Sequence, residues 1–227
     1  EKKNNKLLVI FRGINTEYFS KKNVSDSKFQ KQFQEWNIEK DKFVVLLPGR
    51  LTSWKGQGIF IEAINILNQQ ADVKPFTAII LGSDQGRKVY YKTLINQVAK
   101  YRLSQKIKFI SSCKEMPVAY EMAHVVVSAS IEPEAFGRVS VEAQSMEKPI
   151  VASNIGGSKE TLIENKSGFL FNSGEPISLA EKLKEALNMS ETTAKLMGQE
   201  GRKNVLKKFD VEKMCNSTIT EYKKLIS

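Results

Sequence analysis

Two glutamates, Glu134 and Glu142, stand eight positions apart in the stretch PEAFGRVSVEAQ at residues 133–144. Glu134 precedes Gly137 in loop-like sequence, and Glu142 lies inside the helical pattern that begins near this glycine. Carboxylates accept paired hydrogen bonds from vicinal hydroxyls, which a sugar and a ribose both carry. At about 1.5 Å per helical residue, the two carboxylates would stand on the order of 10 Å apart, comparable with the two ends of a sugar diphosphate.

The helix expected to start near Gly137 supplies the middle of such a site. Its free N–H groups and the positive end of its dipole both favour phosphate. Glu134 would then hold a sugar, the helix start the phosphates, and Glu142 a ribose. Taken singly, each glutamate also has a structural interpretation: Glu134 as a favourable charge near a helix start, and Glu142 as an ordinary helix residue.

Two cations occupy the loop GRLTSWKG at residues 49–56, which follows an apolar run. Arg50 offers a rigid fork of donors that suits phosphate oxygens, and Lys55 adds a mobile point charge. The flanking glycines, Gly49 and Gly56, allow a tight turn and close approach of the backbone. The loop is therefore either a diphosphate-binding loop or a basic surface loop. The P-loop spacing does not occur, and no predicted strand leads into G-x-G-x-x-G.

The elements that must position these residues alternate along the chain. Compact apolar runs typical of buried strands are separated by amphipathic patterns typical of helices. The predicted strands lie at residues 6–11, 43–49, 76–82, 107–111, 124–130, 149–153 and 168–171. The predicted helices lie at residues 58–70, 87–103, 117–123, 137–146 and 158–164, and helical sequence follows from residue 177. This order predicts an α/β fold with a doubly wound, Rossmann-like parallel sheet, which binds ligands beyond the carboxyl ends of its strands where strand order reverses.

Composition and charge limit the class of protein. The chain has 227 residues, 41% of them hydrophobic, and a formal net charge of +10. No apolar run reaches the roughly 18 to 20 residues of a membrane span, and the N-terminal residues lack a signal-peptide pattern. Cys113 and Cys215 have no metal-ligand spacing, which indicates a reduced, cytoplasmic setting. The charge fits nucleic acid, a membrane surface or a phosphorylated small molecule, or is spread over solvated lysine faces.

A third loop, NIGGSKE, carries the pair Gly156-Gly157, which either contacts a ligand or only turns the chain. In their order and separation, GRLTSWKG, EAFGRVSVEA and GGSKE resemble the C-terminal, nucleotide-sugar-binding domain of retaining GT-B glycosyltransferases of the group 1 family. FRGINTEYF, at residues 11–19, resembles the family's crossover between domains. Arg12 stands there in place of the usual asparagine and Asn15 in place of the usual aspartate.

The resemblance implies a Rossmann-like donor domain over residues 1–209, with residues 1–20 as the interdomain crossover. Residues 210–227 would form a helix that crosses back to an N-terminal domain absent from this chain. The implied activity is metal-independent, retaining transfer of a hexosyl unit from a nucleotide diphosphate sugar, with a UDP-sugar favoured over a GDP-sugar. The acceptor, a glycan or glycolipid of cell-envelope lipid or polysaccharide synthesis, would bind through the N-terminal domain.

Further expectations concern partners and location. No cofactor, no metal and no nucleic acid is expected as a partner of the chain. The protein would be cytoplasmic, with peripheral association at the inner face of the plasma membrane. Because the acceptor-binding domain is not part of this sequence, we expect the isolated chain to bind donor but to transfer sugar poorly or not at all.

The resemblance also implies roles for the residues that match the family's motifs. Arg50 and Lys55 would neutralise the diphosphate leaving group, and Glu134 would contact the donor sugar. These three are the expected catalytic residues. Ile110 and Ser111 would face the base, amides near Arg138 and Val139 the phosphates, and Glu142 the ribose. The expected donor-binding residues are Gly49, Ile110, Ser111, Ala135, Phe136, Gly137, Arg138, Val139 and Glu142.

Two other classes of function stay open. A GT-B sugar-phosphate synthase or phosphorylase shares the basic phosphate loop, although a phosphorylase would need a lysine in a pyridoxal-phosphate context, which this sequence does not show. A non-catalytic α/β module that binds an anion, a nucleic acid or a nucleotide sugar would also account for the positive charge. Added salt separates these classes, because binding to nucleic-acid phosphates weakens steeply with salt.

Overall fold

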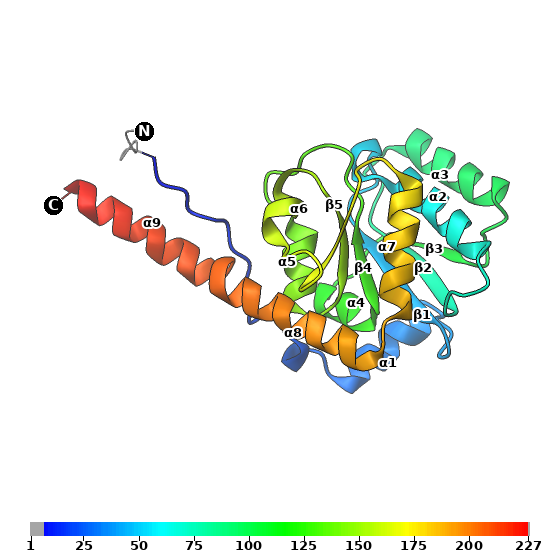
Figure 1. Ribbon diagram of the computed structural model, residues 1–227, viewed down its shortest axis with the longest axis horizontal. Helices are drawn as coiled ribbons and strands as arrows, with labels where there is room; N and C mark the ends of the chain where they lie inside the picture. Colours follow the sequence, from blue (N-terminus) through cyan, green and yellow to red (C-terminus); the bar gives the residue numbers. More distant parts are fainter. Residues whose placement is uncertain (1–6, 227) are drawn as a thin grey trace.

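The computed structural model describes residues 7–226, and a six-stranded parallel sheet forms its centre (Figure 1). The strands are β1 Phe43–Pro48, β2 Phe76–Leu81, β3 Ile107–Ile110, β4 Val125–Ser128, β5 Ile150–Ser153 and β6 Gly168–Phe171. Their order is β3-β2-β1-β4-β5-β6, and every neighbouring pair is parallel. Strand order reverses between β1 and β4, so the predicted doubly wound, Rossmann-like α/β fold is confirmed.

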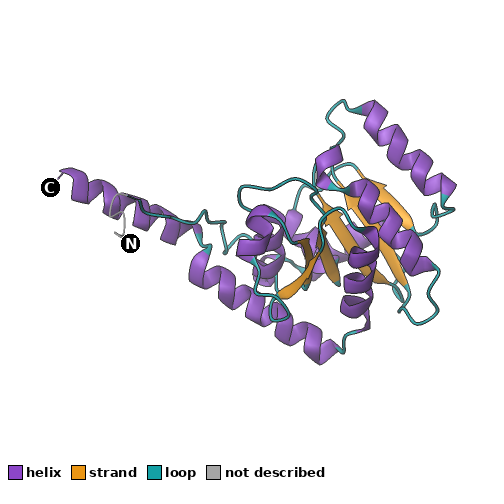
Figure 2. Cartoon of the chain, turned by 45° about the horizontal axis from the view of Figure 1, so that its top comes forward, coloured by secondary structure: helices purple, strands orange, loops and turns teal. Residues whose placement is uncertain are grey.

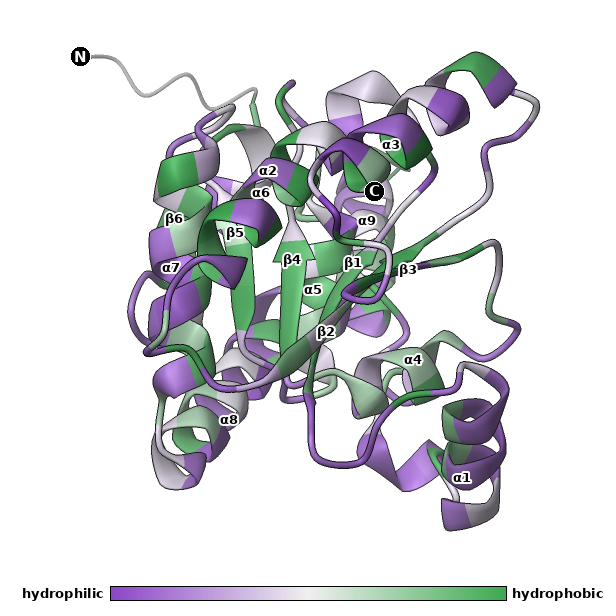
Figure 3. Ribbon diagram, turned by 90° about the vertical axis from the view of Figure 1, so that its right-hand side faces the viewer, coloured by the Kyte–Doolittle hydropathy of each residue, from purple (hydrophilic) through white to green (hydrophobic). Residues whose placement is uncertain are grey.

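Helices cover both faces of this sheet (Figure 2). They are η1 Lys21–Asn23, α1 Asp26–Glu35, η2 Ser53–Lys55, α2 Gln57–Asn68, α3 Lys88–Lys100, α4 Met116–Met122, α5 Arg138–Ser145, α6 Gly156–Thr161, α7 Pro176–Asn188, α8 Glu191–Lys208 and α9 Val211–Ile226. Successive side chains of a strand point to opposite faces. Val45 and Leu47 of β1 therefore pack into a core with α2, α3 and α7, whereas Val44 and Leu46 pack into a second core with α4 and α5. The strands between these cores are mostly hydrophobic (Figure 3).

The predicted strand at residues 6–11 is wrong over the described part of that range. Residues 7–11 form no strand, and Leu7, Leu8 and Val9 are 76%, 60% and 67% exposed. A strand needs a neighbour that takes up its backbone hydrogen bonds. This segment instead runs alongside α9, away from the sheet (Figures 1 and 2). Residue 6 lies outside the described residues.

The segment before α1 is tied to the junction between α8 and α9. The N–H of Ile14 donates to the carbonyl of Phe209 at 2.9 Å, and the N–H of Val211 donates to the carbonyl of Ile14 at 3.0 Å. A Cβ on Gly13 would lie 2.4 Å from the backbone of Asp210, so a larger residue would push the two segments apart. These contacts fix the path of the chain as it enters the domain.

α8 packs closely across the end of α5. A Cβ on Gly198 of α8 would lie 2.1 Å from the carbonyl oxygen of Glu147, just beyond α5. The buried amide of Asn204 donates to the side chain of Gln144 at 3.1 Å, within the same interface. α8 therefore sets the position of α5, which carries Glu142.

We expect Gly198→Ala to lower the free energy of unfolding by about 1–3 kcal/mol, because the added methyl group overlaps a backbone oxygen. In an unhindered helix the same change would stabilise by up to about 1 kcal/mol. Urea unfolding measures the difference. Thr192→Ala, at an exposed position of α8, is the control and should change the free energy by less than about 0.5 kcal/mol. A Gly198→Ala variant as stable as the native chain would contradict the close packing.

Candidate functional site

The loops that follow β1 and β4 touch at the point where strand order reverses. The N–H of Ile131 donates to the carbonyl of Trp54 at 2.8 Å. Gly56 has a φ of +71°, and a Cβ at this position would lie 1.8 Å from the carbonyl oxygen of Ala129. Both the backbone conformation and the space therefore require glycine. The contact presses the basic loop after β1 against the loop that carries Glu134.

Lys55 and Glu134 form an ion pair between these two loops. The Lys55 Nζ lies 2.8 Å from Oε1 of Glu134, and the two side chains are 14% and 12% exposed. The hydroxyl of Ser130 donates to the same carboxylate oxygen. Within residues 7–226, no hydrogen bond reaches Oε2 of Glu134. The carboxylate is thus oriented through one oxygen, and the other is open to a ligand.

Glu142, on the second turn of α5, is 7% exposed. Its Oε2 accepts a hydrogen bond from the Tyr120 hydroxyl at 2.7 Å, and its Oε1 accepts one from Arg138 Nε at 2.7 Å. Burial raises the pKa of the Glu142 carboxyl above its ordinary value, and the two hydrogen bonds offset part of that rise. An ionised Glu142 therefore carries a cost in stability.

The first turn of α5 leaves two N–H groups without intrahelical acceptors. Gly137, with a φ of +75°, is the residue before the helix. The first intrahelical bond runs from the N–H of Ser140 to the carbonyl of Gly137 at 3.0 Å. The N–H groups of Arg138 and Val139 precede this bond. These are the amides predicted to bind phosphate, and the positive end of the helix dipole lies with them.

The glycine pair packs against the loop before α5. Gly156 has a φ of +55°, and a Cβ on Gly157 would lie 2.5 Å from the carbonyl carbon of Phe136. The N–H of Gly157 donates to the carbonyl of Glu134 at 2.7 Å. The pair therefore lets the start of α6 come close enough to fix the backbone that carries Glu134.

A cavity of about 770 Å³ brings several of the predicted residues together. It is lined by Glu134, Ala135, Phe136, Gly137, Arg138 and Glu142, by Met116, and by Arg12, Gly13, Ile14, Asn15, Tyr18 and Phe19. The sequence did not indicate residues 12–19 as part of the site, because no pattern of ligand-binding residues occurs in them. Their one signal is the resemblance of residues 11–19 to a crossover segment.

The remaining predicted residues lie outside this cavity. Ile110 and Ser111 line a separate hollow of about 290 Å³ at the carboxyl ends of β2 and β3. The loop after β1 lies between the two, because Leu51 lines the hollow and Lys55 reaches Glu134. The predicted residues that line neither space are Gly49, Arg50, Lys55 and Val139.

A family model described as "Glycosyl transferases group 1" matches residues 28–204. The chain belongs to this family. The putative glycosyltransferase EpsD of Bacillus subtilis is 27% identical over 195 residues, which make up 86% of this chain and 49% of EpsD. The capsular polysaccharide biosynthesis glycosyltransferase CapM of Staphylococcus aureus is 27% identical over 235 residues, or 96% of this chain and 57% of CapM. The chain thus spans about half the length of these curated relatives.

Solved glycosyltransferase structures share the fold of this group 1 chain. A glycosyltransferase from Rickettsia africae ESF-5 matches with a TM-score of 0.93 and 29% identity, over 98% of this chain and 58% of that one. Anabaena Alr3699/HepE in complex with UDP-glucose matches with a TM-score of 0.83 and 29% identity, over 96% of this chain and 57% of that one. The resemblance to group 1 GT-B glycosyltransferases is therefore confirmed.

We expect Glu142→Gln to raise the free energy of unfolding at neutral pH, because it removes a buried carboxylate. The folded-state pKa of Glu142 lies above 4.5, the ordinary value for a glutamate. Ionisation therefore opposes folding above the folded-state pKa, and the penalty disappears as the pH falls below 4.5. The difference in the free energy of unfolding between the variant and the native chain should therefore be smaller at acid pH than at neutral pH. Urea unfolding at the two pH values measures it.

Glu181→Gln, at an exposed position of α7, is the matched control for this substitution. It should change the free energy of unfolding by less than about 0.5 kcal/mol. A Glu142→Gln variant that is less stable than the native chain at neutral pH would show that the carboxylate stabilises the fold, contrary to this account.

Proposed function

We propose that this chain binds a nucleotide diphosphate sugar beside α5 and forms the donor-binding half of a glycosyltransferase. The observation that carries the proposal is that one cavity is lined by both Glu134 and Glu142, which lie before and after the open first turn of α5. Carboxylates at the two ends and amides in the middle match a sugar, a diphosphate and a ribose. The solved relative Alr3699/HepE, in complex with UDP-glucose, supports this class of ligand.

Each group has a task in this proposal. Glu142 accepts hydrogen bonds from the ribose hydroxyls, and the amides of Arg138 and Val139 donate to the phosphates. Glu134 accepts hydrogen bonds from the sugar hydroxyls, and its free Oε2 supports that role. The ligand would then lie along the cavity from the ribose at Glu142 to the sugar at Glu134.

The proposed reaction is metal-independent, retaining transfer of a hexosyl unit. The bond between the anomeric carbon and the diphosphate oxygen breaks while the oxygen of an acceptor hydroxyl bonds to that carbon. The hydroxyl proton passes to the departing diphosphate, on which negative charge develops. Arg50 and Lys55 neutralise that charge. In this structure Lys55 is paired with Glu134, so the diphosphate must draw the ammonium away from the carboxylate. The same movement leaves Glu134 with more capacity to accept hydrogen bonds from the sugar.

The base is proposed to enter the hollow lined by Ile110 and Ser111. We favour uracil, and hence a UDP-sugar over a GDP-sugar. The solved complexes of Alr3699/HepE with UDP and with UDP-glucose support this choice. The chain is expected to use no cofactor besides this donor substrate.

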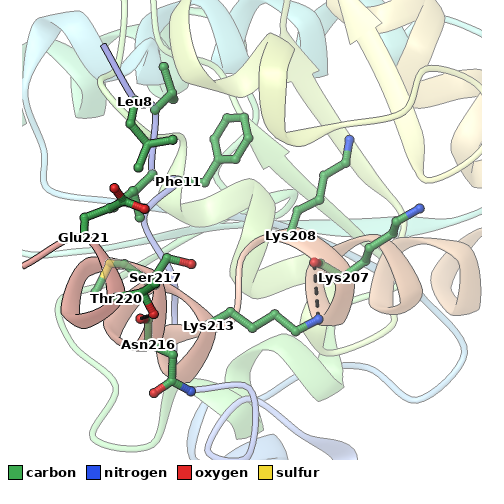
Figure 4. A pocket seen from close by; sticks show the side chains of 12 residues that line it. Leu8, Phe11, Lys207, Lys208, Lys213, Asn216, Ser217, Thr220 and Glu221 are labelled. Atoms are coloured by element: carbon green, nitrogen blue, oxygen red, sulfur yellow. Dashed lines mark hydrogen bonds between the residues drawn. The ribbon is translucent and has the colours of Figure 1, made fainter. Parts of the chain in front are cut away.

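Residues 1–20 and 210–227 are proposed to join this domain to a second, acceptor-binding domain. Residues 8–11 and α9 together line a cavity of about 600 Å³, with Lys207 and Lys213 at its edge (Figure 4). α9 projects from the body of the domain (Figure 1), and apolar side chains along it and along the N-terminal segment are exposed. Exposed apolar side chains on two neighbouring segments fit an interface. That the chain spans about half of its relatives supports the same arrangement.

The acceptor is proposed to be a glycan or glycolipid in cell-envelope lipid or polysaccharide synthesis, handled in the cytoplasm at the inner face of the plasma membrane. The relative CapM, a capsular polysaccharide biosynthesis glycosyltransferase, supports this role. The net charge of +10 supports attraction to an anionic membrane surface. Among the helices within residues 7–226, none has the length and apolar character of a membrane span. By itself the chain is expected to bind donor and to transfer sugar poorly or not at all.

Calorimetric titration with UDP and GDP tests donor binding. We expect UDP to bind more tightly than GDP. Glu142→Ala should weaken UDP binding about ten- to hundredfold, because the loss of hydrogen bonds to a charged acceptor costs about 1.5–3 kcal/mol. Glu181→Ala, at an exposed position of α7, should leave the affinity unchanged. If neither nucleotide binds to this chain or to the full-length protein, the proposal is wrong.

The role of Lys55 is tested by comparing UDP with uridine. Lys55→Ala should weaken UDP binding by about tenfold or more, because a charge-assisted bond to the diphosphate is lost. The affinity for uridine, which carries no phosphate, should change little. Lys88→Ala removes a lysine from the exposed start of α3 and should affect neither ligand. An equal loss for UDP and uridine in Lys55→Ala would place the lysine away from the diphosphate.

A further inference from the structure

Tyr120 of α4 is wholly buried, and its hydroxyl reaches the carboxylate proposed to bind ribose. Its side chain is 0% exposed and is among the largest fully buried ones. The hydroxyl donates to Oε2 of Glu142 at 2.7 Å. The ring packs edge-on against Phe19, with 6.0 Å between the ring centroids. The phenol therefore approaches Glu142 from the core, on the side away from solvent.

Packing alone does not account for this hydroxyl. The core around Tyr120 is apolar, and a phenylalanine would fill nearly the same volume. A hydroxyl buried without a hydrogen bond costs free energy, so the bond to Glu142 determines whether the phenol is tolerated. Burial, and then the neighbouring carboxylate, raise the pKa of Tyr120 well above its ordinary value. The phenol thus stays protonated and remains a donor at neutral pH.

The other oxygen of Glu142 has a partner of a different kind. Oε1 accepts a hydrogen bond from Arg138, whose side chain is 73% exposed. Because it is exposed, Arg138 can turn to water when another donor takes its place on Oε1, whereas Tyr120 cannot leave the core. A vicinal diol can therefore displace Arg138 from Oε1 while Oε2 stays fixed.

We propose that Tyr120 is a positioning residue for ribose binding. It holds one oxygen of Glu142 so that the other faces the cavity, where Arg138 occupies it until the ribose hydroxyls arrive. The inference rests on the proposed nucleotide-sugar function and assigns part of the affinity for the diol to a residue that never touches it. Without the phenol, the buried carboxyl can rotate or take up a proton, and either change makes it a poorer acceptor.

Titration of Tyr120→Phe with UDP and with 2′,3′-dideoxy-UDP, which lacks both ribose hydroxyls, tests the inference. In the native chain UDP should bind more tightly than the analogue. The variant should bind UDP about three- to tenfold more weakly, the effect of one hydrogen bond, and should bind the analogue with unchanged affinity. Tyr101→Phe, a half-buried tyrosine packed in the core on the other face of the sheet, is the matched control and should alter neither affinity.

The outcomes separate this inference from the function on which it rests. If UDP binds neither to this chain nor to the full-length protein, or if the native protein binds UDP and the analogue equally, the proposed ribose site is wrong and the inference with it. A native preference for UDP that survives intact in Tyr120→Phe overturns the inference alone. An equal loss for both ligands in the variant also overturns it, because that pattern indicates a purely structural role.

A double substitution provides the second measurement. In a Glu142→Ala background, which offers the phenol no acceptor, Tyr120→Phe should cause no further change in the preference for UDP over the analogue, because the phenol acts through the carboxylate. A further loss of preference of the same size as in the native background would show that Tyr120 acts by another route and would overturn the inference.

Discussion

The contact between the loops after β1 and β4 is the constraint on which the rest of the site depends. Parallel strands end at one edge of a sheet, and where strand order reverses their loops open a crevice. Gly56 lets the two loops come into contact, since a Cβ there would lie 1.8 Å from the carbonyl oxygen of Ala129. The close approach brings Lys55 within 2.8 Å of Glu134. The ion pair between Lys55 and Glu134 thus follows from the strand order and from the absence of a side chain at Gly56.

Each of the two carboxylates is held by a hydroxyl and a cation. Glu134 accepts hydrogen bonds from Ser130 and Lys55, and Glu142 accepts them from Tyr120 and an exposed arginine. Burial of a carboxylate is costly unless donors compensate it, so the hydroxyls and cations make these positions tolerable in the free protein. In the proposed complex the two hydroxyls stay in place, and the cations are the partners that the ligand displaces.

The sheet could be predicted from the sequence because its strands are compact apolar runs separated by helical periods. Each of the six observed strands lies inside a predicted one. The run at residues 6–11 has the same composition, but composition does not show whether a neighbouring strand is available. The bond between Tyr120 and Glu142 joins two helices across 22 positions, and the cavity wall at residues 12–19 depends on a contact between Gly13 and Asp210. No local pattern encodes either, so neither could be foreseen.

α8 contacts both sides of the cavity. One side is α5, and the other is the segment at residues 12–19 by which the chain enters the domain. Near its middle, Gly198 packs α8 onto the end of α5, which fixes Glu142 relative to the sheet. Just beyond its far end, the carbonyl of Phe209 accepts a hydrogen bond from the N–H of Ile14, and Ile14 lines the same cavity as Glu142. A change in the direction of α9 would therefore reach the cavity through Ile14, while α5 would stay in place. We infer that the two walls of the cavity respond differently to a movement of α9. The wall at α5 belongs to the domain core, and the wall at Ile14 belongs to the segments that leave the domain.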